Sequence, residues 1–287
     1  MNPEIIQTLA ALGADLTPQM LGGTGAIFGP LVPPIPDDVR IARDLAYGPD
    51  ERHLLDIMTP PGAKAAPVLV FVHGGGFIMG NKTTPGSPFY DNVAAFAARN
   101  GMVGVNMTYR LAPASRWPGG ADDMAQAVDW LRAHVADYGG DPARIYLMGQ
   151  SAGAVHVASY LAWSEARIAG AIMVSGLYDI ASAVPTDMHR AYYGDDLSTW
   201  PNMSNVAGMI ASQVPQMLSV CEYDPVDFHK QAASLAAAWA GARGAFPRLH
   251  WLRGHNHLSP AVSLGTSADT LGPLVLDFIA DTAPHGE

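Results

Sequence analysis

Residues 149–153 read Gly149-Gln150-Ser151-Ala152-Gly153, a G-x-S-x-G sequence that directly follows a short apolar run, residues 145–148. The run has the length of a buried strand, and the residues after the motif are rich in Ala and other apolar types, as in a packed helix. At a strand-to-helix junction this motif predicts a nucleophile elbow, a sharp turn that lifts the serine hydroxyl above a sheet. Both glycines are then required, because side chains there would collide with the neighbouring strand and helix.

The pentapeptide has a second interpretation, in which a glycine-flanked serine only caps a helix. Short motifs of this kind also arise by chance, and this chain has 30 glycines among its 287 residues. The rest of the sequence therefore has to decide between the two interpretations.

The composition indicates a folded protein with a substantial core, since 49% of the residues are hydrophobic and 15% are charged. A net charge of −10 argues against nucleic acid as a partner. The single cysteine, Cys221, excludes an internal disulfide and a multi-cysteine metal site. The N-terminus lacks the basic start of a secretory signal, and no apolar run reaches the roughly 18 residues of a membrane span. We therefore expect a cytoplasmic protein without stable membrane insertion.

The middle of the chain alternates between strand and helix patterns. Buried-strand runs lie at residues 68–72, 102–107, 145–148, 168–174 and 216–220, with a weaker one at 248–252, and a hairpin is predicted from residues 39–47 and 52–58. Helical patterns cover residues 91–99, 122–135, 152–163, 227–239 and 269–279. This alternation predicts a mainly parallel sheet with helices on both faces. No linker divides the chain, so we expect a single α/β domain over residues 1–287.

Two segments depart from the alternation. In residues 1–40, apolar positions from Ile5 to Leu16 predict a short amphipathic helix, and the glycines at 22–25 with the prolines up to Pro36 predict a loop after it. That helix would either brace the domain edge or form a flap over a pocket. Residues 176–212 hold many aromatic and methionine side chains and predict an insertion with short helices. These aromatics would form a local core or line a pocket.

A glycine-rich turn follows the first buried strand: His73-Gly74-Gly75-Gly76-Phe77. Without side chains, such glycines can aim backbone N–H donors at an oxygen that becomes negative during acyl transfer. An ordinary strand-to-helix turn is one alternative. A phosphate-binding loop is another, but the glycines are followed by no lysine-serine pair and form no G-x-G-x-x-G.

The chain resembles the α/β-hydrolases of the hormone-sensitive-lipase-like carboxylesterase group and is similar to the related kynurenine formamidases. The resemblance extends from about Asp44 to the C-terminus. It implies an eight-stranded, mainly parallel hydrolase sheet, a small cap from about residues 1–40 and 176–212, and an oxyanion hole at the backbone of Gly75, Gly76 and Ala152. It rests on four segments, in this order: His73-Gly74-Gly75-Gly76-Phe77, Asn106-Met107-Thr108-Tyr109-Arg110-Leu111-Ala112-Pro113, Asp141-Pro142-Ala143-Arg144-Ile145 and Gly149-Gln150-Ser151-Ala152-Gly153.

The acid of a catalytic triad is expected after the strand that ends near Cys221, because this fold orders its triad as nucleophile, acid, histidine. Glu222, Asp224 and Asp227 all qualify by position. The resemblance favours Asp224, since Asp224-Pro225 matches the Asp-Pro of the family. Asp before Pro is also a common helix start, and Glu222 is the alternative acid.

Two histidines follow the last predicted strand, in Gly254-His255-Asn256-His257. Their distance from that strand and the Gly-x-x-His pattern of the family favour His257 as the catalytic base, with His255 as a loop residue. The pair could also suggest zinc, but no third ligand lies at a suitable spacing. We expect structural roles for His73, in the glycine turn, and for His156, in the helix after Ser151.

The expected activity is that of a serine carboxylesterase acting on small to medium acyl esters through an acyl-enzyme, without a metal or organic cofactor. An arylformamidase-type amide hydrolase is the nearest alternative, although three glycines after His73 fit the esterase pattern better. A non-catalytic binding protein with a hydrolase fold is the alternative from another class. Homodimers are common among similar proteins. Candidate substrate-lining residues, each of which could equally be core, are Phe28, Phe89, Tyr178, Trp200 and Leu258.

Overall fold

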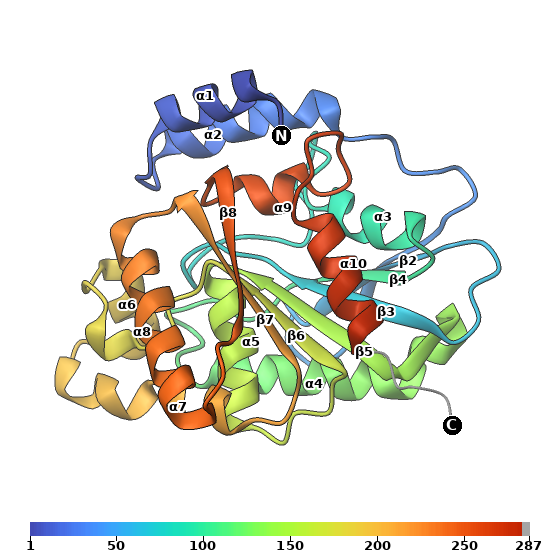
Figure 1. Ribbon diagram of the computed structural model, residues 1–287. Coiled ribbons are helices and arrows are strands. Elements are labelled where there is room, and N and C mark those ends of the chain that lie inside the picture. The colour runs from blue at the N-terminus through green and yellow to red at the C-terminus, as the bar shows by residue number, and fades with distance from the viewer. Residues whose placement is uncertain (283–287) are drawn as a thin grey trace.

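One eight-stranded sheet runs through the computed structural model, which describes residues 1–282, and helices cover both of its faces (Figure 1). The strand order is β1-β2-β4-β3-β5-β6-β7-β8. β1 pairs antiparallel with β2 and β2 with β4, and every later pair is parallel. The strands are β1 (Arg40–Ala46), β2 (Leu54–Thr59), β3 (Ala66–Val72), β4 (Val103–Met107), β5 (Gly140–Gln150), β6 (Gly170–Val174), β7 (Gln216–Tyr223) and β8 (Arg248–Asn256).

Successive side chains of a strand point to opposite faces of the sheet, so both faces are apolar and both are covered by helices. In β3, Val68, Val70 and Val72 belong to the hydrophobic cluster beneath α4 (Gly119–His134) and α5 (Ala152–Trp163). Leu69 and Phe71 belong to the cluster beneath α3 (Asp91–Arg99) and α10 (Gly272–Asp281). α8 (Val226–Arg243) packs on the α5 side, and the short α9 (Ser259–Ser263) follows β8. The predicted α/β fold is confirmed.

The N-terminal region differs from the sequence prediction. Pro3–Leu12 forms the expected helix, α1, but Pro18–Phe28 forms a second helix, α2, where glycines predicted a loop. The glycines are tolerated because they allow close packing: a Cβ on Gly23 would lie 2.8 Å from a methyl carbon of Leu12. Tertiary contact between the two helices outweighs the low helix propensity of glycine, so the loop prediction was wrong for residues 22–25, whereas residues 33–36 lie outside helices and strands as predicted.

Helices α1 and α2 lie over the end of the sheet where β8 finishes (Figure 1). α1 contacts β8, and α2 contacts α9. One buried hydrogen bond joins the two regions, from Asn256 Nδ2 to Thr24 Oγ1 at 2.7 Å. The N-terminal helices are thus attached directly to the turn that follows β8.

The insertion at residues 176–212 consists of short helices, as predicted: η3 (Ile180–Ser182), α6 (Asp187–Tyr193), η4 (Leu197–Met203) and α7 (Val206–Ala211). Three of its aromatic side chains form a separate hydrophobic cluster with Phe77 and Ala152: Tyr192, Tyr193 and Trp200. Single turns of 3-10 helix occur at η1 (Gly29–Leu31) and η2 (Val135–Tyr138). Within the part of the chain that the structure describes, no helix is both long and apolar enough to cross a membrane.

Candidate active site

Ser151 is the first residue after β5 and lies in the sharp turn that the motif predicted. Its backbone has φ 57° and ψ −122°, a conformation that non-glycine residues rarely adopt, and it immediately precedes α5. The turn is held by a hydrogen bond from Ser151 N–H to the carbonyl of Val174 at 2.9 Å. A Cβ at Gly149 would lie 2.3 Å from the carbonyl oxygen of Gly153, and one at Gly153 would lie 2.1 Å from that of Val72. Both motif glycines are therefore required by close packing.

The glycine loop, residues 73–80, lies against Ser151. A Cβ on Gly74 would be 3.1 Å from the Ser151 Cβ. Gly75 and Gly76 have φ of 126° and 57°, values that favour glycine. Within residues 1–282, neither Gly75 nor Gly76 donates its N–H to a protein acceptor. The N–H of Ala152, at the first position of α5, has no acceptor within the helix. Three backbone donors beside Ser151 thus remain available.

Asp224 and His257 meet from neighbouring strand ends. Asp224 follows β7 and His257 follows β8, and His257 Nδ1 lies 2.7 Å from Asp224 Oδ1, with both side chains buried. The other ring nitrogen, His257 Nε2, is buried and has no hydrogen-bond partner among the described residues. The main chain of His257 is tied to the elbow, since Gln150 Nε2 donates to its carbonyl at 2.9 Å. The histidine is therefore oriented on one side and free on the other.

The Asp224 carboxylate also accepts two hydrogen bonds on its second oxygen. Ser175 Oγ donates to Oδ2 at 2.6 Å, and the backbone N–H of Cys221 donates to it at 2.7 Å. Burial alone would raise the pKa of Asp224, but these bonds and the interaction with His257 lower the pKa below its usual value. The carboxylate does not cap α8, whose N-cap is Pro225. Its environment therefore maintains a buried negative charge.

The alternative residues have other partners. Glu222 lies within β7 and accepts the N–H of Gly254 at 2.7 Å, while Asp227 accepts the N–H of Val184 at 2.8 Å. His255 lies within β8 and is fully buried, with Nδ1 2.8 Å from Ser259 Oγ and Nε2 2.7 Å from Thr270 Oγ1. Burial lowers the pKa of His255 to about 4. Since both its nitrogens have partners, His255 is not positioned to exchange a proton with Ser151.

His73 and His156 are fully buried against the Tyr109 ring, His73 stacked on it and His156 edge-on, with ring centroids 4.4 Å from it in both cases. Burial lowers the pKa of His73 to about 4 and that of His156 to about 3. Both rings are therefore neutral near pH 7 and pack as aromatic side chains.

The candidate substrate-lining residues lie in three hydrophobic clusters. Phe28 is 0% exposed in a cluster that Phe89 and Leu258 border, and Trp200 is 1% exposed in the insertion cluster. Tyr178 is also buried, in the core beside α8. The burial of Phe28, Trp200 and Tyr178 fits the core alternative. Phe89 and Leu258 are partly exposed.

Two contacting residues were not identified from the sequence. Ser175 has φ 51° and binds Asp224, and Gln150 holds the carbonyl of His257. The sequence could have indicated Ser175, which directly follows the predicted strand at 168–174. Residues just past parallel strands lie together at one edge of the sheet. Nothing in the sequence distinguished Gln150 from any other residue before the nucleophile.

Comparison with known proteins gives a consistent assignment. The sequence matches the BD-FAE family over residues 55–213, more than half of the chain. It is 29% identical over 231 residues to esterase LipQ of Mycobacterium tuberculosis, an alignment that covers 70% of this chain and 53% of LipQ. The chain spans about half or less of the length of the curated relatives it matches.

Solved structures of low sequence identity share the fold. Esterase B of Lactobacillus rhamnosis, inhibited by a tributyrin phosphonate, superposes with a TM-score of 0.73 at 17% identity, covering 98% of this chain and 96% of that one. An esterase of the bacterial hormone-sensitive lipase family superposes with a TM-score of 0.69 at 20% identity, covering 98% of both chains. The chain belongs to the BD-FAE family and has the α/β-hydrolase fold that the resemblance predicted.

Proposed function

We propose that the protein is a serine carboxylesterase in which Ser151 is the nucleophile, His257 the general base and Asp224 the residue that orients it. One observation carries the proposal. At the sheet edge that holds Ser151, the buried pair of His257 and Asp224 leaves one imidazole nitrogen, Nε2, without a hydrogen-bond partner among residues 1–282. A buried base that is oriented on one side and unoccupied on the other is suited to take a proton from a neighbouring hydroxyl.

In the proposed reaction His257 Nε2 removes the proton of Ser151 Oγ while this oxygen attacks the ester carbonyl. The buried carboxylate of Asp224 stabilises the imidazolium that forms. When the tetrahedral intermediate collapses, the carbon–oxygen bond to the alcohol breaks and His257 returns its proton to the leaving alkoxide. Water, activated by the same histidine, then attacks the acyl-enzyme and releases the carboxylic acid. Only protein groups and water take part.

The negative oxygen of each intermediate would be held by the backbone N–H groups of Gly75, Gly76 and Ala152. The support for this role is that Ala152 directly follows Ser151 and that the two glycines directly follow Gly74, whose added Cβ would contact Ser151. Within residues 1–282 neither glycine N–H has another acceptor. Loss of one such donor typically lowers kcat by about 100-fold or more.

The substrate class follows from the relatives, several of which are named esterases or carboxylic ester hydrolases. On this proposal the chain is a single hydrolase domain. Its cap comes from residues 1–40 and 176–212 and determines which small or medium acyl esters reach Ser151.

A fluorophosphonate probe tests the catalytic claim. Wild type should be labelled covalently, and Ser151→Ala, which keeps the turn and removes only the hydroxyl, should not. The control is a matching circular dichroism spectrum and melting temperature for the two proteins. Folded wild type that resists the probe would support the non-catalytic binding protein instead.

A substrate panel separates ester from amide hydrolysis. p-Nitrophenyl esters of two to eight acyl carbons should be hydrolysed with a kcat/KM well above that for N-formylkynurenine. A clear preference for the formamide would replace the esterase proposal with an arylformamidase. The Ser151→Ala protein serves as the blank for both substrates.

A further inference from the structure

The segment at residues 109–112, which follows β4, contacts the glycine loop along its length. Tyr109 Oη donates to the carbonyl of His73 at 2.9 Å, where the loop begins. Ala112 N–H donates to the carbonyl of Phe77 at 2.9 Å, in the middle of the loop. Each bond ends on a backbone oxygen, so it fixes the course of the main chain.

Arg52 completes the arrangement at the far end of the loop. Its Nε donates to the carbonyl of Tyr109 at 2.8 Å, and its Nη2 donates to the carbonyl of Gly80 at 2.9 Å. One planar guanidinium therefore joins the segment after β4 to the end of the loop. Because the fork of donors is rigid, it sets a fixed separation between the two carbonyls.

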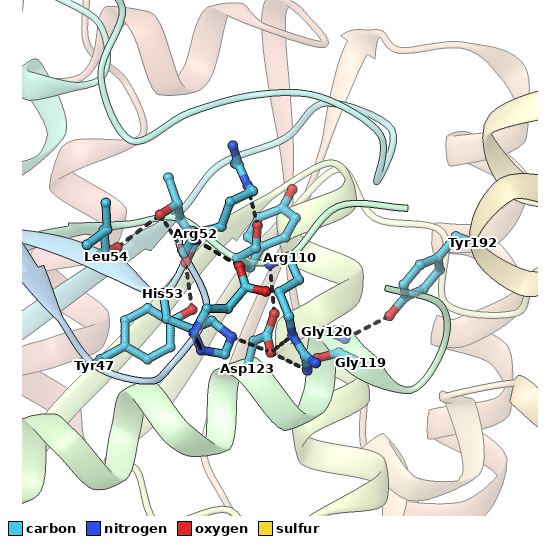
Figure 2. A network of polar contacts seen from close by, with 12 residues as sticks. Tyr47, Arg52, His53, Leu54, Arg110, Gly119, Gly120, Asp123 and Tyr192 are labelled. Carbon is cyan, nitrogen blue, oxygen red and sulfur yellow. Dashed lines mark hydrogen bonds and ion pairs between the residues drawn. The ribbon is translucent and has the colours of Figure 1, made fainter. Parts of the chain in front are cut away.

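The segment is itself anchored by a buried carboxylate, as Figure 2 shows. Asp123 of α4 is 0% exposed and accepts the backbone N–H of Arg110 at 2.8 Å and the Nε of the same residue at 2.7 Å. The oxygen that accepts from Arg110 Nε, Asp123 Oδ1, also lies 3.0 Å from Nε2 of the buried His53. Arg110 is thereby bound through both main chain and side chain, and the segment cannot shift without breaking these bonds.

The glycine loop needs such external support for two reasons: its backbone adopts positive φ angles, and its glycines have many accessible conformations in the absence of packing. Gly75, Gly76, Phe77 and Gly80 all have positive φ, and the glycines among them lose the most conformational entropy on ordering. Oxyanion donors act only when held about 2.7–3.1 Å from the developing charge. A displacement of about 1 Å can cost 100-fold in rate.

We propose that Tyr109 and Arg52 are positioning residues that hold the two ends of the glycine loop so that its N–H groups face the oxyanion. The inference rests on the proposed function, since it assigns these N–H groups to the transition state. It gives a role to the Tyr109-Arg110-Leu111-Ala112 part of a sequence motif that the triad does not use. Neither side chain touches the substrate.

A pair of tyrosine-to-phenylalanine substitutions tests the proposal. Tyr109→Phe removes the bond to His73 while keeping the ring that stacks on the imidazole. Tyr47→Phe is the matched control: Tyr47 Oη, also buried, donates at 2.7 Å to the carbonyl of Thr108, the residue before Tyr109, and within residues 1–282 it makes no hydrogen bond to the loop. The two variants should lose similar melting temperature. Only Tyr109→Phe should lower kcat, by about tenfold or more, with KM within about threefold.

A boronic acid provides a readout that general destabilisation would not change. Its tetrahedral adduct with a serine places a negative oxygen where the oxyanion forms. Its affinity should therefore fall in parallel with kcat in Tyr109→Phe, and stay near the wild-type value in Tyr47→Phe. Arg52→Met should show the same pattern as Tyr109→Phe, and Arg52→Lys, which retains a donor, should recover part of the loss.

The outcomes separate the two proposals. If wild type is active and Tyr109→Phe matches Tyr47→Phe in kcat and boronate affinity, the positioning role is overturned and the esterase stands. A loss confined to KM or to melting temperature overturns it as well. If folded wild type hydrolyses no ester and binds no boronate, both proposals fail.

Discussion

The carboxyl ends of β7 and β8 each carry two ionisable side chains two residues apart, and the two members of each pair have different surroundings. At the end of β7, Glu222 accepts the backbone N–H of Gly254, whereas Asp224 pairs with His257. At the end of β8, both ring nitrogens of His255 lie within hydrogen-bond distance of hydroxyl groups, whereas Nε2 of His257 has no hydrogen-bond partner among the described residues. The first members of the two pairs have separate partners, and the second members bind each other.

Position relative to the strand end explains the difference. β7 ends at Tyr223 and β8 at Asn256, so Glu222 and His255 still belong to strands, while Asp224 and His257 are the first residues beyond them. Ser151 and Ser175 hold the same position after β5 and β6. The first residues past adjacent parallel strands lie at one edge of the sheet, where this class of fold binds its ligands.

The largest contrast should appear between the two histidines. His257→Ala should lower kcat by about 10⁴-fold or more, because the proposed base is lost. His255→Asn should keep activity within about tenfold of wild type, since the two ring nitrogens of His255 are already engaged by the hydroxyls of Ser259 and Thr270. Steady-state hydrolysis of a p-nitrophenyl ester measures both. The opposite ranking, in two folded proteins, would assign the base to His255.

The acidic pair should give the next largest contrast. Asp224→Asn should lower kcat by about 10³- to 10⁴-fold, because the neutral amide no longer holds the required imidazole tautomer or stabilises its charge. Glu222→Gln should stay within about tenfold, since the amide oxygen can still accept the Gly254 N–H. The same ester assay applies, with melting temperatures to confirm folding. A severe loss in Glu222→Gln alone would contradict the assignment of Asp224.

The smallest expected effect is on the free energy of unfolding and concerns the buried His255. The folded pKa of His255 is about 4, below the usual 6.5, so between these values the unfolded chain binds a proton that the folded chain does not. The free energy of unfolding therefore decreases as pH falls from 6.5 towards 4, by up to about 1.4 kcal/mol per pH unit for this residue. His73 and His156, with pKa about 4 and about 3, act in the same direction.

Urea unfolding at several pH values between 4 and 7 measures this slope. His255→Asn should make the free energy of unfolding depend less steeply on pH, because one buried neutral histidine is removed. An unchanged slope would contradict the lowered pKa of His255. The lowered pKa of Asp224 acts in a different window, because its stabilisation is lost only as pH falls below the usual 3.8. From pH 4 to 7 the wild-type slope also includes carboxyl groups such as Asp269, whose pKa is raised by burial, so the difference between wild type and His255→Asn gives the share of His255.

Much of the fold was predictable because local pattern and tertiary packing agree. The helices at residues 91–99 and 152–163 have the bounds that their sequence predicts, and the hairpin and all six apolar runs are strands. The exception is α2, where the glycines predicted a loop. The glycines disfavour a helix there, but Thr17 caps its start, and contacts with Leu12 of α1 and with Asn256 hold it in place.

The sequence by itself determined the types of group available: a serine between two glycines, a glycine-rich turn, and acids and histidines in the order of a hydrolase. It could not determine where β7 and β8 end, since the apolar runs stop at 220 and 252 while pairing continues to Tyr223 opposite Asn256. Strand ends depend on hydrogen bonds to a neighbour far away in the chain, and apolar pattern records only burial. Tertiary structure alone therefore decided that Asp224 and His257 meet while Glu222 and His255 turn to other partners.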